Sequence, residues 1–195
     1  DVPQRLQLAK DAFSKPFFPE NQHLACSLSH SKGIVGALIV ESDKLKVTST
    51  KLKVASDKQQ VASDMLHIAG QASTVNGQLS IGCDIQVVIE KMTRIAHKFL
   101  NEPEKAYVES RPKAEYLQLL HLFWTAKESL YKAYGLKELD FRKNLFVDHI
   151  EWDGQTGTGS GRVEKGAFQQ EFQLIFNKIE VFEKTELIWT VAFDC

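Results

Sequence analysis

Cysteine is scarce in this sequence, and its scarcity excludes two kinds of site. Three cysteines occur among the 195 residues, at Cys26, Cys83 and Cys195, and none of them forms a C-x-x-C pair. An odd number of widely separated cysteines predicts neither a structural zinc site nor a framework of disulfides. We therefore expect a protein of the reducing cytoplasm.

Long apolar runs and an excess of one charge are also missing. The longest apolar stretch, GIVGALIV (33–40), is far shorter than the roughly 20 residues that span a membrane, and no signal peptide precedes it. Lys and Arg total 24 against 25 Asp and Glu, so the formal net charge is −1. General nucleic-acid-binding proteins are strongly basic. We therefore expect neither a nucleic-acid nor a membrane partner, and any anion must be bound by a local cluster of cations.

The order of strand and helix patterns predicts an α+β fold. Apolar segments at 24–28 and 34–40 predict two strands joined by a polar tip at 29–33. Asn76-Gly77 is a hairpin turn signal before another strand pattern. Strands, then helices, then strands again are typical of α+β rather than of a parallel βαβ array. Helices are predicted at 5–13, 56–70, 90–100 and 114–134, and strands follow from 145 onward.

Three short segments carry polar groups that have an ordinary structural explanation when each is taken alone. Asp84 in SIGCDIQ ends an apolar strand pattern, where it either caps a turn or binds a partner, because an unpaired buried charge is costly. Glu128 and Lys132 in WTAKESLYKAYG have the i,i+4 spacing of a surface ion pair. His30 in SLSHS fits a polar hairpin tip. No single one of these residues identifies a site.

Together, the same segments predict a site for metal and phosphate. Asp84 and Glu128 offer the hard oxygen ligands that Mg²⁺ prefers, and the remaining positions are left for water and a substrate phosphate. Lys127, Lys132 and His30 supply positive charge for a polyphosphate.

The segments SLSHS, IGCDIQ and WTAKESLYKAYG, in that order, resemble the 4′-phosphopantetheinyl transferases of the Sfp type. That family carries an S-H-S tip, a G-I-D-I-E strand and a W-x-x-K-E-S/A-x-x-K helix. DAFSKPFFPENQHL (11–24) is similar to its G-K-P segment, and RIAHKFLNEPE (94–104) to its helix and F-x-x-x-E turn. The resemblance covers about residues 11–40 and 79–193.

The resemblance implies the fold of that family, with two pseudo-symmetric α/β halves, antiparallel sheets and coenzyme A in the cleft between them. Residues 1–80 are then a shortened first half with the S-H-S hairpin, and residues 81–195 are the second half with the metal strand and the K-E-S helix. The implied activity is that of a holo-acyl-carrier-protein synthase. It transfers the 4′-phosphopantetheine arm of coenzyme A to a serine of an acyl or peptidyl carrier protein, requires Mg²⁺ and releases 3′,5′-ADP.

The resemblance also implies roles in catalysis. Asp84 and Glu128 are expected to hold Mg²⁺ against the coenzyme A pyrophosphate, with Gln86 at the position of a third ligand. Glu128 is the best candidate to accept the serine proton. Lys127 is expected to stabilise charge on the transferring phosphoryl group.

Substrate contacts follow from the same resemblance. Lys132, and His30 with its neighbour Ser29, are expected to neutralise phosphate, and Lys15 in the G-K-P-like position is expected beside the nucleotide. The acidic helix of a carrier protein requires a local basic surface, which we place at Lys91, Arg94 and Lys98 on one helical face. The alternative is an ordinary solvated basic face.

Three departures from the family pattern keep other interpretations open. Gln86 replaces a usual acidic ligand, which predicts weaker Mg²⁺ binding rather than none. Only 28 residues precede Ser29, so much of the usual first half is missing. The segment 41–80 is longer than the family's connection, and it either rebuilds that half or marks a truncated chain. A non-catalytic module that binds coenzyme A or a carrier protein is the alternative function, and an unrelated α+β interaction domain is a third.

Overall fold

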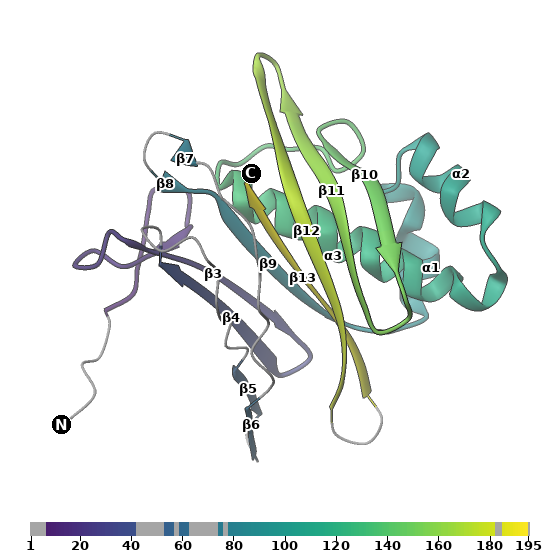
Figure 1. Cartoon of the computed structure of the whole chain (residues 1–195), viewed down its shortest axis with the longest axis horizontal. Coiled ribbons are helices and arrows are strands. Elements are labelled where there is room, and N and C mark those ends of the chain that lie inside the picture. Colours follow the sequence, from purple (N-terminus) through teal and green to yellow (C-terminus); the bar gives the residue numbers. More distant parts are fainter. Residues whose placement is uncertain are drawn as a thin grey trace.

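The centre of the protein is an antiparallel sheet packed on a long helix (Figure 1). The computed structural model of the chain describes residues 7–41, 53–56, 59–62, 74–75, 78–181 and 185–194. The predicted α+β class is confirmed. The sheet has the strand order β10-β11-β12-β13-β9, and all its neighbours are antiparallel. Its strands are β9 (Ile81–Val87), β10 (Leu145–Trp152), β11 (Thr156–Lys165), β12 (Phe168–Val181) and β13 (Thr185–Asp194).

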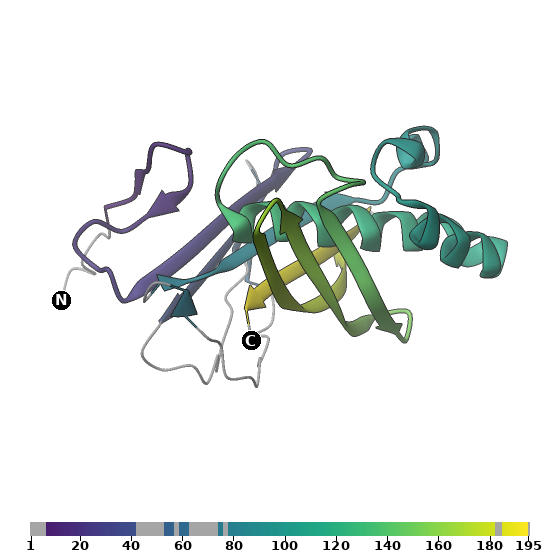
Figure 2. The same cartoon turned by 90° about the horizontal axis from the view of Figure 1, so that it is seen from above.

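Both faces of the sheet are buried near β9 and β13. Helix α3 (Tyr116–Tyr134) lies across one face (Figure 2), and the hairpin of β3 (Leu24–Ser31) and β4 (Ile34–Glu41) packs on the other. In β13, Ile188 belongs to the core beneath α3, whereas Trp189 belongs to the core beneath β4. Because both faces are buried, β13 is a nearly continuous apolar run rather than an alternating one.

The alternation of side chains along β9 decides which of them reach α3. Cys83 and Ile85 pack into the core shared with β4. Successive residues of a strand point to opposite faces, so Gly82, Asp84 and Gln86 lie on the other side. Gly82 packs directly against the backbone of α3. The strand therefore directs Asp84 toward the helix that carries Glu128.

The helices that follow β9 are mostly as the sequence predicts. The predicted helix at 90–100 is present as α1 (Lys91–Ile95), which continues as a 3₁₀ turn over Ala96–Lys98. The long helix predicted at 114–134 is confirmed as α3. A 3₁₀ turn over Lys113–Glu115 leads into it, and Gly135 ends it in the left-handed conformation, with φ 73°.

Helix α2 (Glu102–Ser110) has no counterpart among the predicted elements. Pro103 seemed to break the helical pattern, but it lies in the first turn of α2, where a missing N–H costs no hydrogen bond. Asn101 caps this helix. Its side chain accepts from the Glu104 backbone, and the Glu104 carboxylate accepts from the Asn101 backbone, which completes a capping box.

The predicted helix at 5–13 is wrong, because its described part, residues 7–13, contains a two-residue strand and a turn but no helix. β1 (Ala9–Lys10) pairs antiparallel with β2 (Pro16–Phe17). Asp11 explains the difference. Its carboxylate accepts hydrogen bonds from the backbone N–H groups of Phe13 and Lys15, a turn contact that competes with helix formation.

The predicted polar tip at 29–33 is also corrected. Ser29, His30 and Ser31 belong to β3, and the turn of the hairpin is confined to Lys32 and Gly33, which both have positive φ. Ser29 and Ser31 are buried, whereas His30 between them is exposed. The serines are therefore core-facing positions of a strand rather than members of a solvated loop.

Several predictions between 42 and 80 can be checked only in part. Most of the predicted helix at 56–70 lies outside the described residues, and its described part is strand. The Asn76-Gly77 turn also lies outside them, but the strands on either side of it do pair antiparallel. The short strands here are β5 (Lys53–Ser56), β6 (Gln59–Ala62), β7 (Thr74–Val75) and β8 (Gln78–Leu79).

Within the described residues, no helix combines the length and the apolar character needed to cross a membrane.

Cys26 and Cys83 are both buried free thiols.

Gly82 provides the first test, because it sets the distance between β9 and α3. A Cβ at this position would collide with the Ser129 carbonyl and lie 2.6 Å from the Ala133 nitrogen. We expect Gly82→Ala to lower the free energy of unfolding by about 3 kcal/mol, because the atoms in the way belong to the backbone of α3 and cannot move aside as a side chain could. Gly166→Ala is the control: space around it is open, so only its positive φ opposes the change, at about 1–2 kcal/mol. Urea unfolding measures both, and equal losses would contradict the packing argument.

Candidate functional site

Asp84 is a buried carboxylate held from two sides. Its Oδ1 accepts a hydrogen bond from Ser29 Oγ at 2.7 Å and another from Lys132 Nζ at 2.7 Å. Only 6% of the residue is exposed. Burial raises the pKa of Asp84, and the Lys132 charge and the Ser29 hydrogen bond oppose that shift. The structure therefore brings together Asp84, Ser29 and Lys132, three of the residues that the sequence singled out.

Lys132 makes a different ion pair from the i,i+4 pair considered for it. Its ammonium group crosses from α3 to β9, where it binds Asp84 and donates to the Cys83 carbonyl at 2.9 Å. A partly buried cation with these two partners links helix and strand. The solvated Glu128–Lys132 pair is therefore not the main contact of this lysine.

Glu128 lies half-buried on α3, in the neighbourhood of the same charges. Burial raises its pKa to about 7, the negative charge of Asp84 adds to that shift, and Lys132 opposes it. The negative charge of Asp84 therefore acts on Glu128, although 44 positions separate the two residues. A carboxyl group with a pKa near neutrality can exchange a proton at physiological pH.

The two carboxylates suit a divalent cation whose other ligands are water and the phosphate oxygens of a substrate. Mg²⁺ commonly takes one or two protein carboxylates and completes its shell with water and phosphate oxygens. No group of three or more His, Cys, Asp or Glu that could hold a metal occurs in the described part of the chain. Gln86 lies on the same face of β9, half-buried, and its amide donates to the Val87 carbonyl at 3.4 Å. Its amide oxygen is the only ligand type that it can add.

A pocket of about 580 Å³ is lined by Ser29 and Lys132, the two residues whose side chains bind Asp84. Its walls come from the β1–β2 hairpin, from β3 and from the end of α3, so it lies between the first part of the chain and the second. Among the residues that the structure describes, no aspartate or glutamate lines it. In a chain whose net charge is −1, that is a local concentration of positive charge. The basic residues that line it are Lys10, Lys15, His30, Lys132 and Lys137.

Lys15 and His30 both line this pocket. The Lys15 ammonium donates to the Ala133 carbonyl at 3.2 Å, and its stem packs beside Gly135. Burial lowers the pKa of Lys15, against the charges of Asp11 and Asp194. His30 is exposed on the outer face of β3. The pocket also has apolar walls, formed by residues such as Phe13, Pro16, Leu28, Val35, Tyr131 and Leu136.

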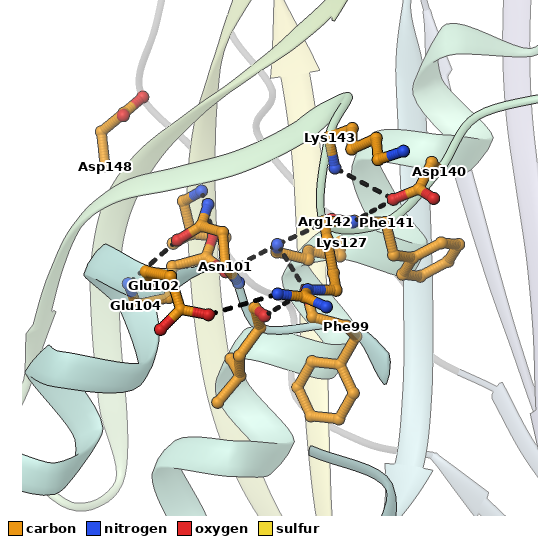
Figure 3. A network of polar contacts seen from close by, with 12 residues as sticks. Phe99, Asn101, Glu102, Glu104, Lys127, Asp140, Phe141, Arg142, Lys143 and Asp148 are labelled. Carbon is orange, nitrogen blue, oxygen red and sulfur yellow. Dashed lines mark hydrogen bonds and ion pairs between the residues drawn. The ribbon is translucent and has the colours of Figure 1, made fainter. Parts of the chain in front are cut away.

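Lys127 does not line this pocket, and its proposed contact with the transferring phosphoryl group disagrees with its place in the fold. The side chain is fully buried. Its ammonium pairs with Glu104 at 2.6 Å and donates to the carbonyls of Phe99 at 2.7 Å and Phe141 at 2.8 Å (Figure 3). Burial lowers the pKa of Lys127, and the Glu104 charge opposes this. With all three of its donors used, Lys127 is a structural cation.

Glu104 is the residue that the sequence reasoning missed. Besides Lys127, its carboxylate accepts from the backbone N–H groups of Asn101 and Val147, at 2.9 and 3.0 Å. The network therefore joins α2, α3 and β10 (Figure 3). The N-x-x-E capping box at 101–104 was the signal that could have identified it.

The basic residues assigned to docking are exposed but do not share one regular helical face. Lys91 and Arg94 lie on α1, whereas Lys98 ends the 3₁₀ turn. The change from α to 3₁₀ geometry alters the rotation per residue and displaces Lys98 from the expected stripe. Ile95 and Phe99, which follow Arg94 and Lys98 in the sequence, pack into the core and add nothing to this surface.

An α+β fold with a carboxylate pair next to a cation-lined pocket is suited to a ligand that carries phosphate. The family model of the 4′-phosphopantetheinyl transferase superfamily matches residues 80–190. This is more than half of the chain and includes β9 and α3, and the chain belongs to that superfamily. A search of curated proteins found no match.

The Lys127–Glu104 pair provides a test of its structural role. Lys127→Met and Glu104→Gln each leave one buried partner unsatisfied, so we expect each to lower the free energy of unfolding by about 3–5 kcal/mol. The double variant should lose clearly less than the sum, because neither charge is then left alone.

Removal of the exposed Arg111–Glu115 pair by alanine is the control, with an expected loss below about 1 kcal/mol. Strict additivity of the Lys127 and Glu104 changes in urea unfolding would show that the two side chains do not depend on each other.

Proposed function

We propose that this protein is a holo-acyl-carrier-protein synthase. It transfers the 4′-phosphopantetheine arm of coenzyme A to a serine of an acyl or peptidyl carrier protein. The observation that carries the proposal is the Asp84–Lys132 pair with Glu128 in its electrostatic field, next to a pocket that Lys132 lines and that no acidic residue lines among those the structure describes. Membership of the superfamily supports the same reaction class.

Coenzyme A is the proposed occupant of the pocket. Its phosphates require cations, which Lys10, Lys15, His30 and Lys137 supply, and its pantetheine arm and adenine require the apolar walls. The volume of about 580 Å³ lies within the usual range for small-molecule sites, roughly 300–1,000 Å³. Since the walls come from both parts of the chain, they support a cleft between a first half (residues 1–80) and a second half (residues 81–195).

Asp84 and Glu128 are the proposed ligands of Mg²⁺, with Gln86 as a weak third member. When bound, the ion neutralises negative charge on the pyrophosphate. The site fits such an ion because two interacting carboxylates, one of them buried, are opposed by a single lysine. The burial of Asp84 also keeps its orientation fixed before any ligand arrives.

The reaction itself requires a nucleophile, a proton acceptor and a leaving group. The carrier serine Oγ attacks the β-phosphate, the phosphorus–oxygen bond to the nucleotide breaks, and 3′,5′-ADP leaves with the bond's electron pair. Glu128 is the proposed acceptor of the serine proton. Lys132 and His30 supply positive charge near the phosphates, and the reducing cytoplasm remains the expected compartment.

A non-catalytic module that binds coenzyme A or a carrier protein is the second candidate. Gln86 favours it, because an amide replaces the expected third acidic ligand. The two candidates differ in one product: only the transferase releases 3′,5′-ADP from coenzyme A when Mg²⁺ and an apo carrier protein are present.

Glu128→Gln tests the proposed chemistry. The amide keeps the volume of the side chain but removes both the charge for Mg²⁺ and the proton acceptor. We expect 3′,5′-ADP release to fall at least about 100-fold, within the range for a lost general base, with unchanged circular dichroism. Glu138→Gln, at an exposed position just beyond α3, is the control and should retain full activity. Turnover by Glu128→Gln at the wild-type rate would assign proton transfer to another group.

The docking surface is tested by reversing Arg94 and Lys98 to Glu. Exposed charges act mainly on the rate of association, so kcat/KM for the carrier protein should fall about tenfold at low salt and less at high salt. Coenzyme A affinity should not change. The control is the double reversal of Lys113 and Lys143, which are also exposed cations. If both double variants behave alike, the carrier protein docks elsewhere.

A further inference from the structure

Strand β3 is joined to β9 by serine side chains instead of by backbone pairing. The Oγ atoms of Ser27, Ser29 and Ser31 accept hydrogen bonds from the N–H groups of Cys83, Ile85 and Val87, at 2.9, 3.1 and 3.2 Å. Each pair is 56 positions apart. We call this set, Ser27, Ser29 and Ser31, the serine ladder.

The constant offset shows that β3 and β9 run parallel and in register. Side chains on one face of β3 recur every second residue, as do the N–H groups along one edge of β9, so the two periods match. The other edge of β9 is paired with β13. Without the ladder, the free edge of β9 would present buried N–H groups with no acceptor.

Ser29 is the member of the ladder that also contacts the candidate site. Its hydroxyl accepts from Ile85 and donates its single proton to Asp84 Oδ1 at 2.7 Å. Only 6% of Ser29 is exposed. A hydroxyl has one proton, so Ser29 cannot donate to a phosphate while it holds Asp84.

We propose that Ser29 is a positioning residue that orients the Asp84 carboxylate for a divalent cation, rather than a ligand of phosphate. Ser29 and Lys132 approach the same oxygen, Oδ1, from β3 and from α3. Two hydrogen bonds from separate elements fix the rotamer of Asp84, and neither goes to Oδ2. The proposal rests on the proposed function, because it assigns Asp84 to a metal.

The test compares Ser29→Ala with Ser31→Ala, which removes the same kind of ladder bond but does not line the pocket. Both variants should lower Tm by a few degrees, since each leaves one buried N–H unpaired. Mn²⁺ affinity, measured by electron paramagnetic resonance with coenzyme A present, should fall about tenfold for Ser29→Ala only. Coenzyme A affinity in EDTA, measured by calorimetry, should match between the two variants.

Ser29→Thr retains the hydroxyl and should restore Mn²⁺ affinity. If Ser29→Ala does not fold, Ser29→Cys replaces it in the Mn²⁺ comparison with Ser31→Ala. The thiol has a similar volume but is a weaker hydrogen-bond donor, so Mn²⁺ affinity should again fall. A loss of metal-free coenzyme A affinity specific to position 29 would instead make Ser29 a phosphate ligand. Equal Mn²⁺ affinities of Ser29→Ala and Ser31→Ala would contradict the proposal, because Ser29 would then only stabilise the fold, as Ser31 does.

These readouts separate the inference from the proposed function. A wild-type protein that binds Mn²⁺ and coenzyme A but releases no 3′,5′-ADP would refute the reaction, and the role of Ser29 would still be decided by the Mn²⁺ comparison. A wild-type protein that binds no Mn²⁺ would overturn the inference as well.

Discussion

The rest of the site depends on the burial of the Asp84 carboxylate. A charge in this position must be paired or hydrogen-bonded, because its desolvation is otherwise too costly. Its partners come from distant parts of the chain: Ser29 from β3 and Lys132 from α3. Meeting that one requirement holds both elements against β9. The cation-lined pocket opens between the same two elements. The buried charge of Asp84 therefore explains both why β3 and α3 pack against β9 and why the proposed ligand pocket lies between them.

Helix α3 carries two lysines with different roles, one at the candidate site and one in the structural core. Lys132 points to Asp84 at the site, whereas Lys127, five residues earlier, is buried against Glu104 on another side of the helix. The Lys127–Glu104 pair uses all three lysine donors and both carboxylate oxygens, which is the condition under which a buried ion pair is tolerated. It anchors α3 to α2 and β10, while Gly82 allows β9 to approach α3 directly. Glu128 is positioned by this frame.

The sequence was sufficient for the α+β class, for α3 and for the strand that carries Asp84, because the strand pattern and the helix pattern were both clear. It was insufficient where a tertiary partner decides. Lys127 looks like a site residue until Glu104, 23 positions earlier, is seen to neutralise it. The serines of β3 look like a polar loop because their burial depends on N–H groups of β9. Pro103 looks like a helix breaker unless the cap at Asn101 is recognised.

The most direct test is a crystal structure with coenzyme A and Mn²⁺, which substitutes for Mg²⁺ and is located by its anomalous scattering. The account predicts one strong anomalous peak within bonding distance of both Asp84 and Glu128, and coenzyme A phosphates beside Lys132 and His30. A peak bound by neither carboxylate, or coenzyme A bound away from the pocket between β3 and α3, would contradict it.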